Sequence, residues 1–217
     1  MGKRMVALGM ALALIAAAGG ASGADKHPAG QLVDAVSVLV KGASSRAGAG
    51  AELLADFQGT AGPGLFTQAD AAALALDDTI AAVQRIDASA RPQVATASLA
   101  YLKAAQNLVK SLQDARRKAM RVQTLEHEGA KAVTDLKAAR ASDRPPLLAH
   151  MEQVFGQSDD AEAAMKESVT RSISALAELE LRTALLAAQL GSSDALLPQK
   201  TVAAVKRGLQ AVQPQEE

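Results

Sequence analysis

The 217-residue chain is rich in small apolar residues, poor in aromatic ones and electrically balanced. Hydrophobic residues make up 49% of it and aromatic residues only 2%, while 23 basic residues balance 23 acidic ones. Much of the apolar fraction is alanine, which favours closely packed helices over sheet. The charge balance gives no general attraction to nucleic acid. Because cysteine is absent, disulfides, thiolate metal sites and cysteine nucleophiles are excluded.

Residues 1–24 have the pattern of a cleavable secretory signal peptide. Lys3 and Arg4 supply positive charge, residues 5–18 are apolar, and small residues follow. The apolar stretch is shorter than the roughly 20 residues needed to span a bilayer, so we expect cleavage, with retention as an anchor as the alternative. We therefore expect a bacterial exported protein, periplasmic or secreted, with no transmembrane span after cleavage. Residues 25–217 are then a single all-helical domain.

The first part of the mature chain predicts two short helices separated by a flexible stretch. Leu32, Val36 and Val40 recur at helical spacing. Residues 41–50 (KGASSRAGAG) are small, and we expect them to be flexible, with a second short helical piece after them. The sequence QGTAGPG at 58–64 marks a break before the next element.

A further helix is predicted between the QGTAGPG break and Pro92. Thr67 and Asp70 have the form of a capping box, which opens a helix that runs to about Ser89. Pro92 ends that helix and is a good first residue for the next one.

The longest pattern in the chain predicts two long antiparallel helices. From Pro92 to about residue 141, small and apolar residues recur in alternating steps of four and three, the heptad spacing of a coiled coil. The sequence SDRPP at 142–146 predicts a sharp turn. A second apolar stripe follows and ends at Gly191, a natural C-cap. In this hairpin, about 92–191, residues that face each other have numbers that add up to about 287.

These elements predict an all-α fold, an elongated helical bundle built on a long antiparallel, coiled-coil-like hairpin with shorter flanking helices. A last short helix is expected after GSSD at 191–194, with four apolar residues facing inward: Val202, Val205, Leu209 and Val212. The shorter helices lie next in sequence to the end of the hairpin opposite the turn. We therefore expect a four- or five-helix bundle at that end and a two-helix projection towards the turn.

A histidine between two glutamates, in LEHEG at 125–129, raises the question of a metal site. Across the predicted hairpin, His127 faces Asp160, with Asp159 and Glu162 nearby. Imidazole and carboxylates are ligands that suit zinc or another divalent ion. The candidate metal ligands are therefore His127, Asp159, Asp160 and Glu162.

A joint in the hairpin is the interpretation that we favour for the same region. Adjacent helical residues point about 100° apart, so the two glutamates and the histidine cannot all converge on one ion. Gly129 and Gly156 weaken both helices at one level. Ser158 is then a good N-cap, and the acidic run after it complements the dipole of a restarted helix.

A run of cations in DARRKAMR at 114–121 gives a candidate contact for an anion or an acidic partner. With two cations on the facing helix, the candidates are Arg116, Arg117, Lys118, Arg121, Lys166 and Arg171. A solvated helix face is the simpler interpretation. Aromatic residues that stack on bases are missing from this run, which argues against nucleic-acid binding.

No motif in the chain points to catalysis or to a cofactor, so we expect a protein that is not an enzyme. The long hairpin favours an adaptor, scaffold or chaperone-like binder that acts by protein–protein contacts, with another envelope protein as partner. A second copy of the chain is left open as a partner. The alternative is a helical bundle that binds a small ligand or a divalent metal.

Overall fold

The computed structural model describes residues 28–59 and 64–213, and all regular structure among them is helical. Its elements are α2 (Pro28–Ala55), α3 (Leu65–Arg85), α4 (Pro92–Ala138), the 3₁₀ turn η1 (Ala141–Asp143), α5 (Arg144–Leu190) and α6 (Gln199–Val212). The predicted signal peptide, 1–24, lies outside the described residues.

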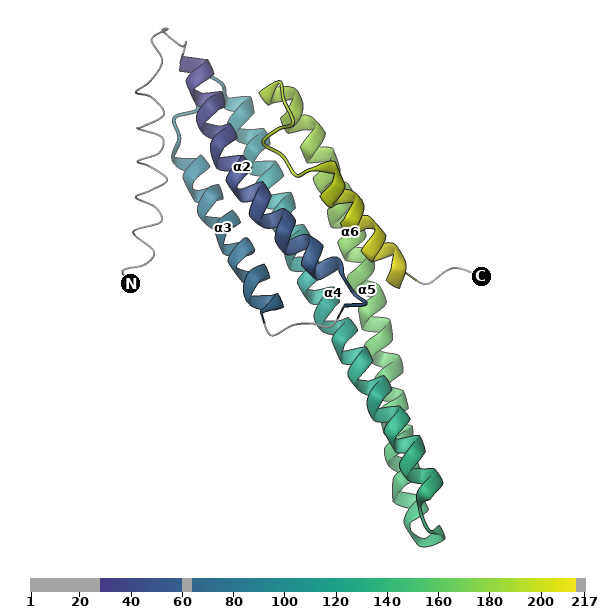
Figure 1. Cartoon of the computed structure of the whole chain (residues 1–217). Helices are drawn as coiled ribbons and strands as arrows, with labels where there is room; N and C mark the ends of the chain where they lie inside the picture. The colour runs from purple at the N-terminus through teal and green to yellow at the C-terminus, as the bar shows by residue number, and fades with distance from the viewer. Residues whose placement is uncertain (1–27, 60–63, 214–217) are drawn as a thin grey trace, which may run out of the picture.

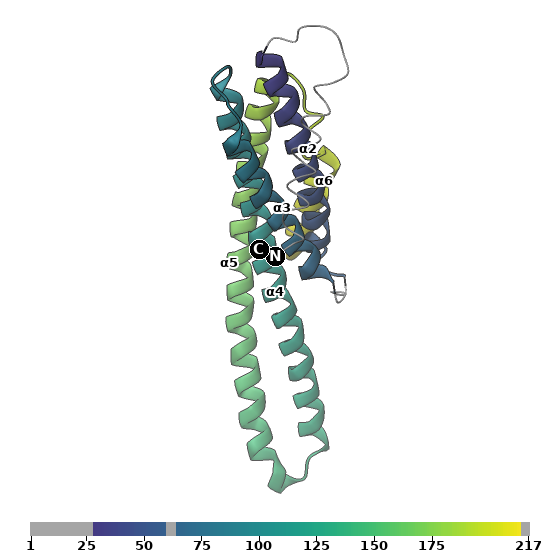
Figure 2. The same cartoon turned by 90° about the vertical axis from the view of Figure 1, so that its left-hand side faces the viewer.

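The hairpin of α4 and α5 is the long axis of the molecule. Each of these helices has 47 residues, which corresponds to a length of about 70 Å. The helices α2, α3 and α6 lie beside the half of the hairpin that is far from its turn, and the other half projects alone (Figure 1, Figure 2). The predicted all-α bundle with a long helix pair is confirmed.

The two ends of the hairpin lie where the sequence predicted them, whereas its turn lies a few residues earlier than predicted. The helix α4 begins at Pro92, and α5 ends before Gly191, whose φ of 73° is left-handed. The turn occupies residues 139–143 rather than 142–146, because α5 already begins at Arg144. The two prolines that follow Arg144 lie in the first turn of α5, where a backbone N–H has no acceptor within the helix.

The helix α2 is the largest departure from the sequence-based expectation. Residues 41–50, predicted to be flexible, lie inside one continuous helix. A Cβ on Gly50 would lie 3.1 Å from the Cβ of Ala72 on α3, and one on Gly48 would lie 3.4 Å from Thr201 on α6. The small residues therefore allow neighbouring helices to approach closely, and this tertiary packing outweighs their weak helix propensity.

The start of α3 also differs from the prediction. The helix begins at Leu65 with Gly64 as N-cap and no side-chain cap bond, so the predicted capping box is wrong. Asp70 instead accepts a hydrogen bond of 2.9 Å from Nε2 of Gln113 on α4. Its carboxylate thus joins two helices. The helix ends at Arg85, a few residues before the predicted end at Ser89.

The segment between α5 and α6 is packed against the bundle by a buried tyrosine. Tyr101 on α4 is fully buried, and its hydroxyl accepts a hydrogen bond of 3.0 Å from the backbone N–H of Leu197. The same hydroxyl lies 2.8 Å from Oγ of Ser44 on α2. Burial raises the pKa of Tyr101, and the bonds with Ser44 and Leu197 lower it only in part. Because this segment is not helical, α6 begins at Gln199, a few residues later than the start predicted after GSSD.

The hydrophobic core ends where α4 and α5 leave the bundle. Its fully buried members extend from Val94 to Ala119 on α4 and from Val169 to Leu186 on α5. In the projection, the buried residues form only a narrow seam between the two helices: Val122, Leu125, Gly129, Ala132 and Val154. The projection is therefore supported by a single helix–helix contact.

Gly208 gives a test of the close packing between α6 and α2. A Cβ at this position would overlap the backbone carbonyl oxygen of Ala55, so Gly208→Ala must push the helices apart. We expect the free energy of unfolding in urea to fall by about 1–3 kcal/mol. Gly42→Ala, on α2 with open space around it, is the matched control and should raise it by about 0.5–1 kcal/mol. Equal shifts in the two variants would contradict a close-packing role.

Candidate functional site

The predicted metal ligands lie on the surface of the projection and do not form a ligand set. His127, Asp159, Asp160 and Glu162 are all exposed. Glu162 forms an ion pair of 2.7 Å with Lys166, one turn further along α5. Within residues 28–59 and 64–213, no three His, Asp or Glu side chains are placed to hold a metal ion together. The structure therefore does not bring the predicted ligands together.

The predicted joint at Gly129 and Gly156 is also wrong, because α4 and α5 are continuous through both residues. Ser158 lies inside α5 and caps nothing. Gly129 is buried against the ring of Phe155, and a Cβ on Gly129 would lie 3.0 Å from Cε1 of that ring. The glycine thus makes room for a side chain of the facing helix.

Arg116, predicted as a surface anion contact, lies in the interior with 1% of its surface exposed. Its Nη2 donates to the backbone carbonyl of Gly59, and its guanidinium carbon lies 5.9 Å from the centre of the Phe57 ring. Among the described residues, its Nε and Nη1 have no partner. Burial lowers the pKa of Arg116, and the charge of Asp56 offsets part of this effect. Arg116 therefore holds the end of α2 against α4.

Three of the other predicted cations also have separate surroundings. The guanidinium of Arg117 lies 5.0 Å from the centre of the Phe66 ring on α3. Arg121 donates to Oε1 of Gln157 at 3.3 Å, and Lys166 is paired with Glu162. The six predicted cations therefore do not form one continuous surface for an anion or an acidic partner.

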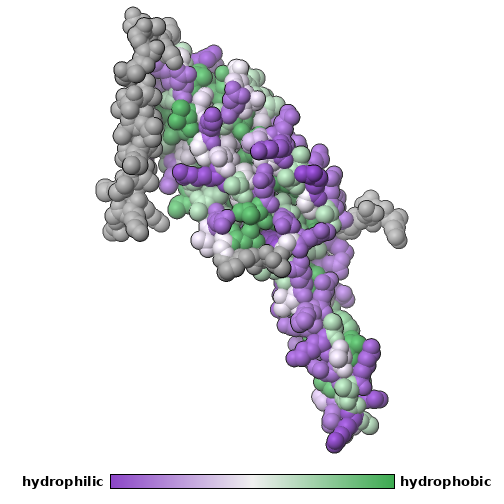
Figure 3. All heavy atoms as spheres, viewed as in Figure 1, coloured by the Kyte–Doolittle hydropathy of each residue, from purple (hydrophilic) through white to green (hydrophobic). Residues whose placement is uncertain are grey.

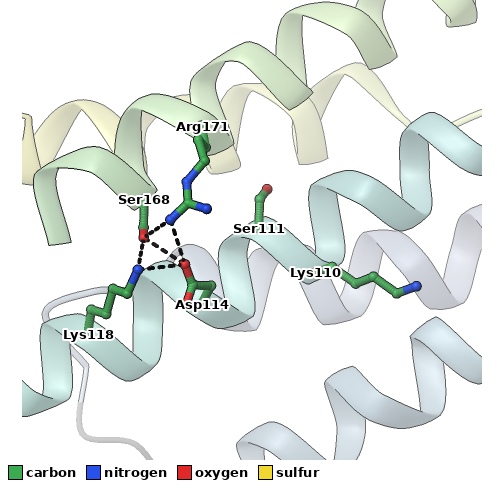
Figure 4. A pocket seen from close by; sticks show the side chains of 6 residues that line it. All are labelled: Lys110, Ser111, Asp114, Lys118, Ser168 and Arg171. Carbon is green, nitrogen blue, oxygen red and sulfur yellow. Dashed lines mark hydrogen bonds and ion pairs between the residues drawn. The ribbon is translucent and has the colours of Figure 1, made fainter. Parts of the chain in front are cut away.

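Lys118 and Arg171 do meet, around Asp114 and Ser168, and we name these four residues the waist cluster (Figure 4). Oδ2 of Asp114 accepts hydrogen bonds from Oγ of Ser168 at 2.7 Å, Nζ of Lys118 at 2.9 Å and Nη2 of Arg171 at 3.1 Å. Oγ of Ser168 accepts from Lys118 at 2.6 Å and from Arg171 at 3.0 Å. Two cations, one from each helix, are thus held by one carboxylate and one hydroxyl.

Helical spacing explains why these side chains meet. Asp114 and Lys118 are four residues apart on α4, and Ser168 and Arg171 are three apart on α5, so each pair lies on one face of its helix. The cluster lies at the level where the bundle core ends, next to buried Ala119 and Val169. It therefore joins α4 to α5 at the base of the projection.

The waist cluster shifts the pKa of its carboxyl group. Burial raises the pKa of Asp114, but the hydrogen bonds from Ser168 and Lys118 and the charges of Lys118 and Arg171 together outweigh it, so the net shift is downward from 3.8. The cluster thus favours an ionised Asp114.

An open pocket of about 400 Å³ lies beside the waist cluster and is lined additionally by Lys110 and Ser111 of α4. Lys110 is exposed and has no hydrogen bond or ion pair among the described residues. Its side chain extends away from the cluster in Figure 4. Ser111 donates to the backbone carbonyl of Leu108 at 2.9 Å. The pocket thus combines three cationic side chains, two hydroxyls and one carboxylate.

The projection carries a second surface of interest, formed by exposed apolar side chains. Leu148 is 42% exposed and Phe155 is 44% exposed, both on α5. Apolar surface interrupts the hydrophilic surface near the end of the projection in Figure 3. Residues 131–150, which we call the tip, contain four cations and two carboxylates: Lys131, Lys137, Arg140, Arg144, Asp135 and Asp143.

Between the tip and the waist cluster, the hairpin is acidic. Residues 126–130 and 151–162, which we call the acidic band, contain no Lys or Arg but six carboxylates: Glu126, Glu128, Glu152, Asp159, Asp160 and Glu162. Charge therefore alternates along the projection.

No family model, curated protein or solved structure matches this chain. In the described part of the chain, no helix combines the length and the apolar character that a membrane span requires. The function of the chain is therefore inferred from its sequence and from the geometry of the candidate site.

Asp114→Asn tests the contribution of the waist carboxylate to stability. Because the folded-state pKa of Asp114 is lowered, its contribution is present above the unfolded value of 3.8 and is lost as pH falls through the lower folded value. Between pH 5 and pH 2.5, the free energy of unfolding should therefore fall less in Asp114→Asn than in the wild type.

The matched control is Asp78→Asn, which removes an exposed carboxylate with no partner among the described residues. Denaturant unfolding at a series of pH values measures the effect. If the free energy of unfolding falls by the same amount between pH 5 and pH 2.5 in Asp114→Asn and in Asp78→Asn, the proposed role of the waist cluster is contradicted.

Proposed function

We propose that this chain is an exported, non-enzymatic helical protein that binds an envelope partner protein through its projecting hairpin, as an adaptor, scaffold or chaperone-like binder. The observation that carries the proposal is that α4 and α5 continue beyond the bundle core with only a narrow seam between them. Export rests on the signal-like residues 1–24, and the non-catalytic role rests on the sequence, which carries no catalytic motif.

The energetics of the projection support a binding role. Ordering each residue of a helix costs backbone entropy of about 1–2 kcal/mol, and a seam with Gly129 and Ala132 at its centre buries little apolar area in return. Leu148 and Phe155 remain exposed. A partner that covers them adds the burial that the hairpin itself does not provide.

The charges of the projection indicate the chemistry of that partner. The tip has more cations than carboxylates, and the acidic band follows directly after it. A partner surface with an apolar pocket flanked by carboxylates complements Leu148 and the cations of the tip, and basic side chains beside the region that covers Phe155 complement the acidic band. The partner surface is therefore expected to carry charges in the order opposite to that of the projection.

Site-specific photocrosslinking in the cell envelope tests this proposal. A photoreactive residue at position 148 or 155 should crosslink to one and the same protein, at peptides that contain carboxylates for position 148 and basic residues for position 155. The matched control is position 74 on α3, where Leu74 is 49% exposed on the bundle. It should not reach that protein.

Binding of the purified pair completes the test. Leu148→Ser should raise the dissociation constant about tenfold, equivalent to about 1.4 kcal/mol, because it removes an apolar contact at the tip. Leu74→Ser should leave it unchanged, and both variants should retain wild-type helix content because both side chains are exposed. Crosslinks from position 74 alone, or equal effects of the two variants, would refute the proposal.

A further inference from the structure

We propose that the pocket beside the waist cluster binds a phosphate-type dianion, either free phosphate or the phosphoryl group of a lipid headgroup. This inference is independent of the function proposed for the tip, because it rests on different residues. The pocket lies between α4 and α5 and is lined by Lys110, Ser111 and the waist cluster.

The charge of the pocket is the first argument. The lining contains three cations, Lys110, Lys118 and Arg171, but only one carboxylate, that of Asp114. Two positive charges therefore remain uncompensated within the lining. A dianion balances them, and bonds between charged donors and phosphate oxygens are among the stronger hydrogen bonds in proteins.

The free donors are the second argument. Only Nη2 of Arg171 is used in the cluster, so Nε and Nη1 have no partner among the described residues. Lys110 likewise has no partner there, and its flexible side chain comes from the same face of α4, one turn before Asp114. Guanidinium and ammonium groups together are the usual protein donors to phosphate.

The third argument is that part of the pocket is already held in place. Ser168 is buried with 1% exposure, donates to Asp114 and accepts from both Lys118 and Arg171. Asp114 and Ser168 thus act as positioning residues for the two cations. Fixing the donors before the anion arrives reduces the entropy lost on binding.

Titration calorimetry with inorganic phosphate tests the proposal, with potassium chloride of equal ionic strength as the ion control. Saturable binding should appear with phosphate and not with chloride. Arg171→Ala and Lys110→Ala should each weaken it at least tenfold. Lys166→Ala removes the same charge from α5 at a cation that is paired with Glu162, and it should change the affinity less than twofold.

Asp114→Asn separates a ligand site from a purely structural ion-pair network. The substitution removes the negative charge that competes with the ligand but keeps a side-chain oxygen that can accept from Lys118 and Arg171. Phosphate should therefore bind at least about fivefold more tightly, the effect of one unit charge at ~4 Å in water. Circular dichroism checks that the variant is folded. Unchanged or weaker phosphate binding in the folded variant would contradict the site.

Vesicles distinguish the two sources of the phosphoryl group. Binding of the wild type, but not of Arg171→Ala, to phosphatidic acid vesicles, with no binding to phosphatidylcholine vesicles, would identify the phosphomonoester of a lipid headgroup. Binding of free phosphate with no vesicle binding would identify a soluble anion. The proposal is overturned if neither probe binds saturably, or if Lys166→Ala weakens binding as much as Arg171→Ala does.

Discussion

Close approach between helices is the constraint on which this structure depends, because the chain has almost no aromatic side chains to fill space between them. Gly50 allows α3 to approach α2, and Gly208 allows α6 to approach the end of α2. A core built from leucine, valine and alanine, with few aromatic rings, is filled only where several helices surround each residue. It therefore ends at Ala119 and Val169, where the flanking helices end, and the rest of the hairpin projects.

The elements set by local chemistry could be predicted from the sequence, whereas those set by tertiary partners could not. Pro92 and Gly191 mark the ends of the hairpin by their backbone preferences, and the heptad spacing indicated its length. Residues 41–50 are equally compatible with a flexible linker and with a tightly packed helix. Contact with α3 and α6 makes these residues helical, and those contacts cannot be read from the local sequence. Thr67 likewise has the sequence pattern of a helix N-cap but does not cap α3.

The candidate site was predicted in part, for a geometric reason. Consecutive cations on a helix point about 100° apart, so Arg116 faces the interior, Arg117 faces α3 and Lys118 faces α5. The predicted register placed Arg171 on the segment that faces Lys118, but it did not reveal that Asp114 joins the two cations. Ser168 has no charge and no motif, so only its position between the helices reveals its role. The waist cluster thus places ion pairs at the base of the projection, whereas the tip carries exposed cations and apolar side chains.

Hydrogen exchange along α4 and α5, followed by mass spectrometry, tests most directly the central claim that the core ends at the waist cluster. We expect backbone amides in residues 94–119 and 169–186 to exchange only through global unfolding. Amides in residues 122–136 and 147–163 should exchange at least about a hundredfold faster, through local opening of the thin seam. Equal protection along the whole hairpin would contradict the claim, because it would mean that the projection is as stable as the bundle.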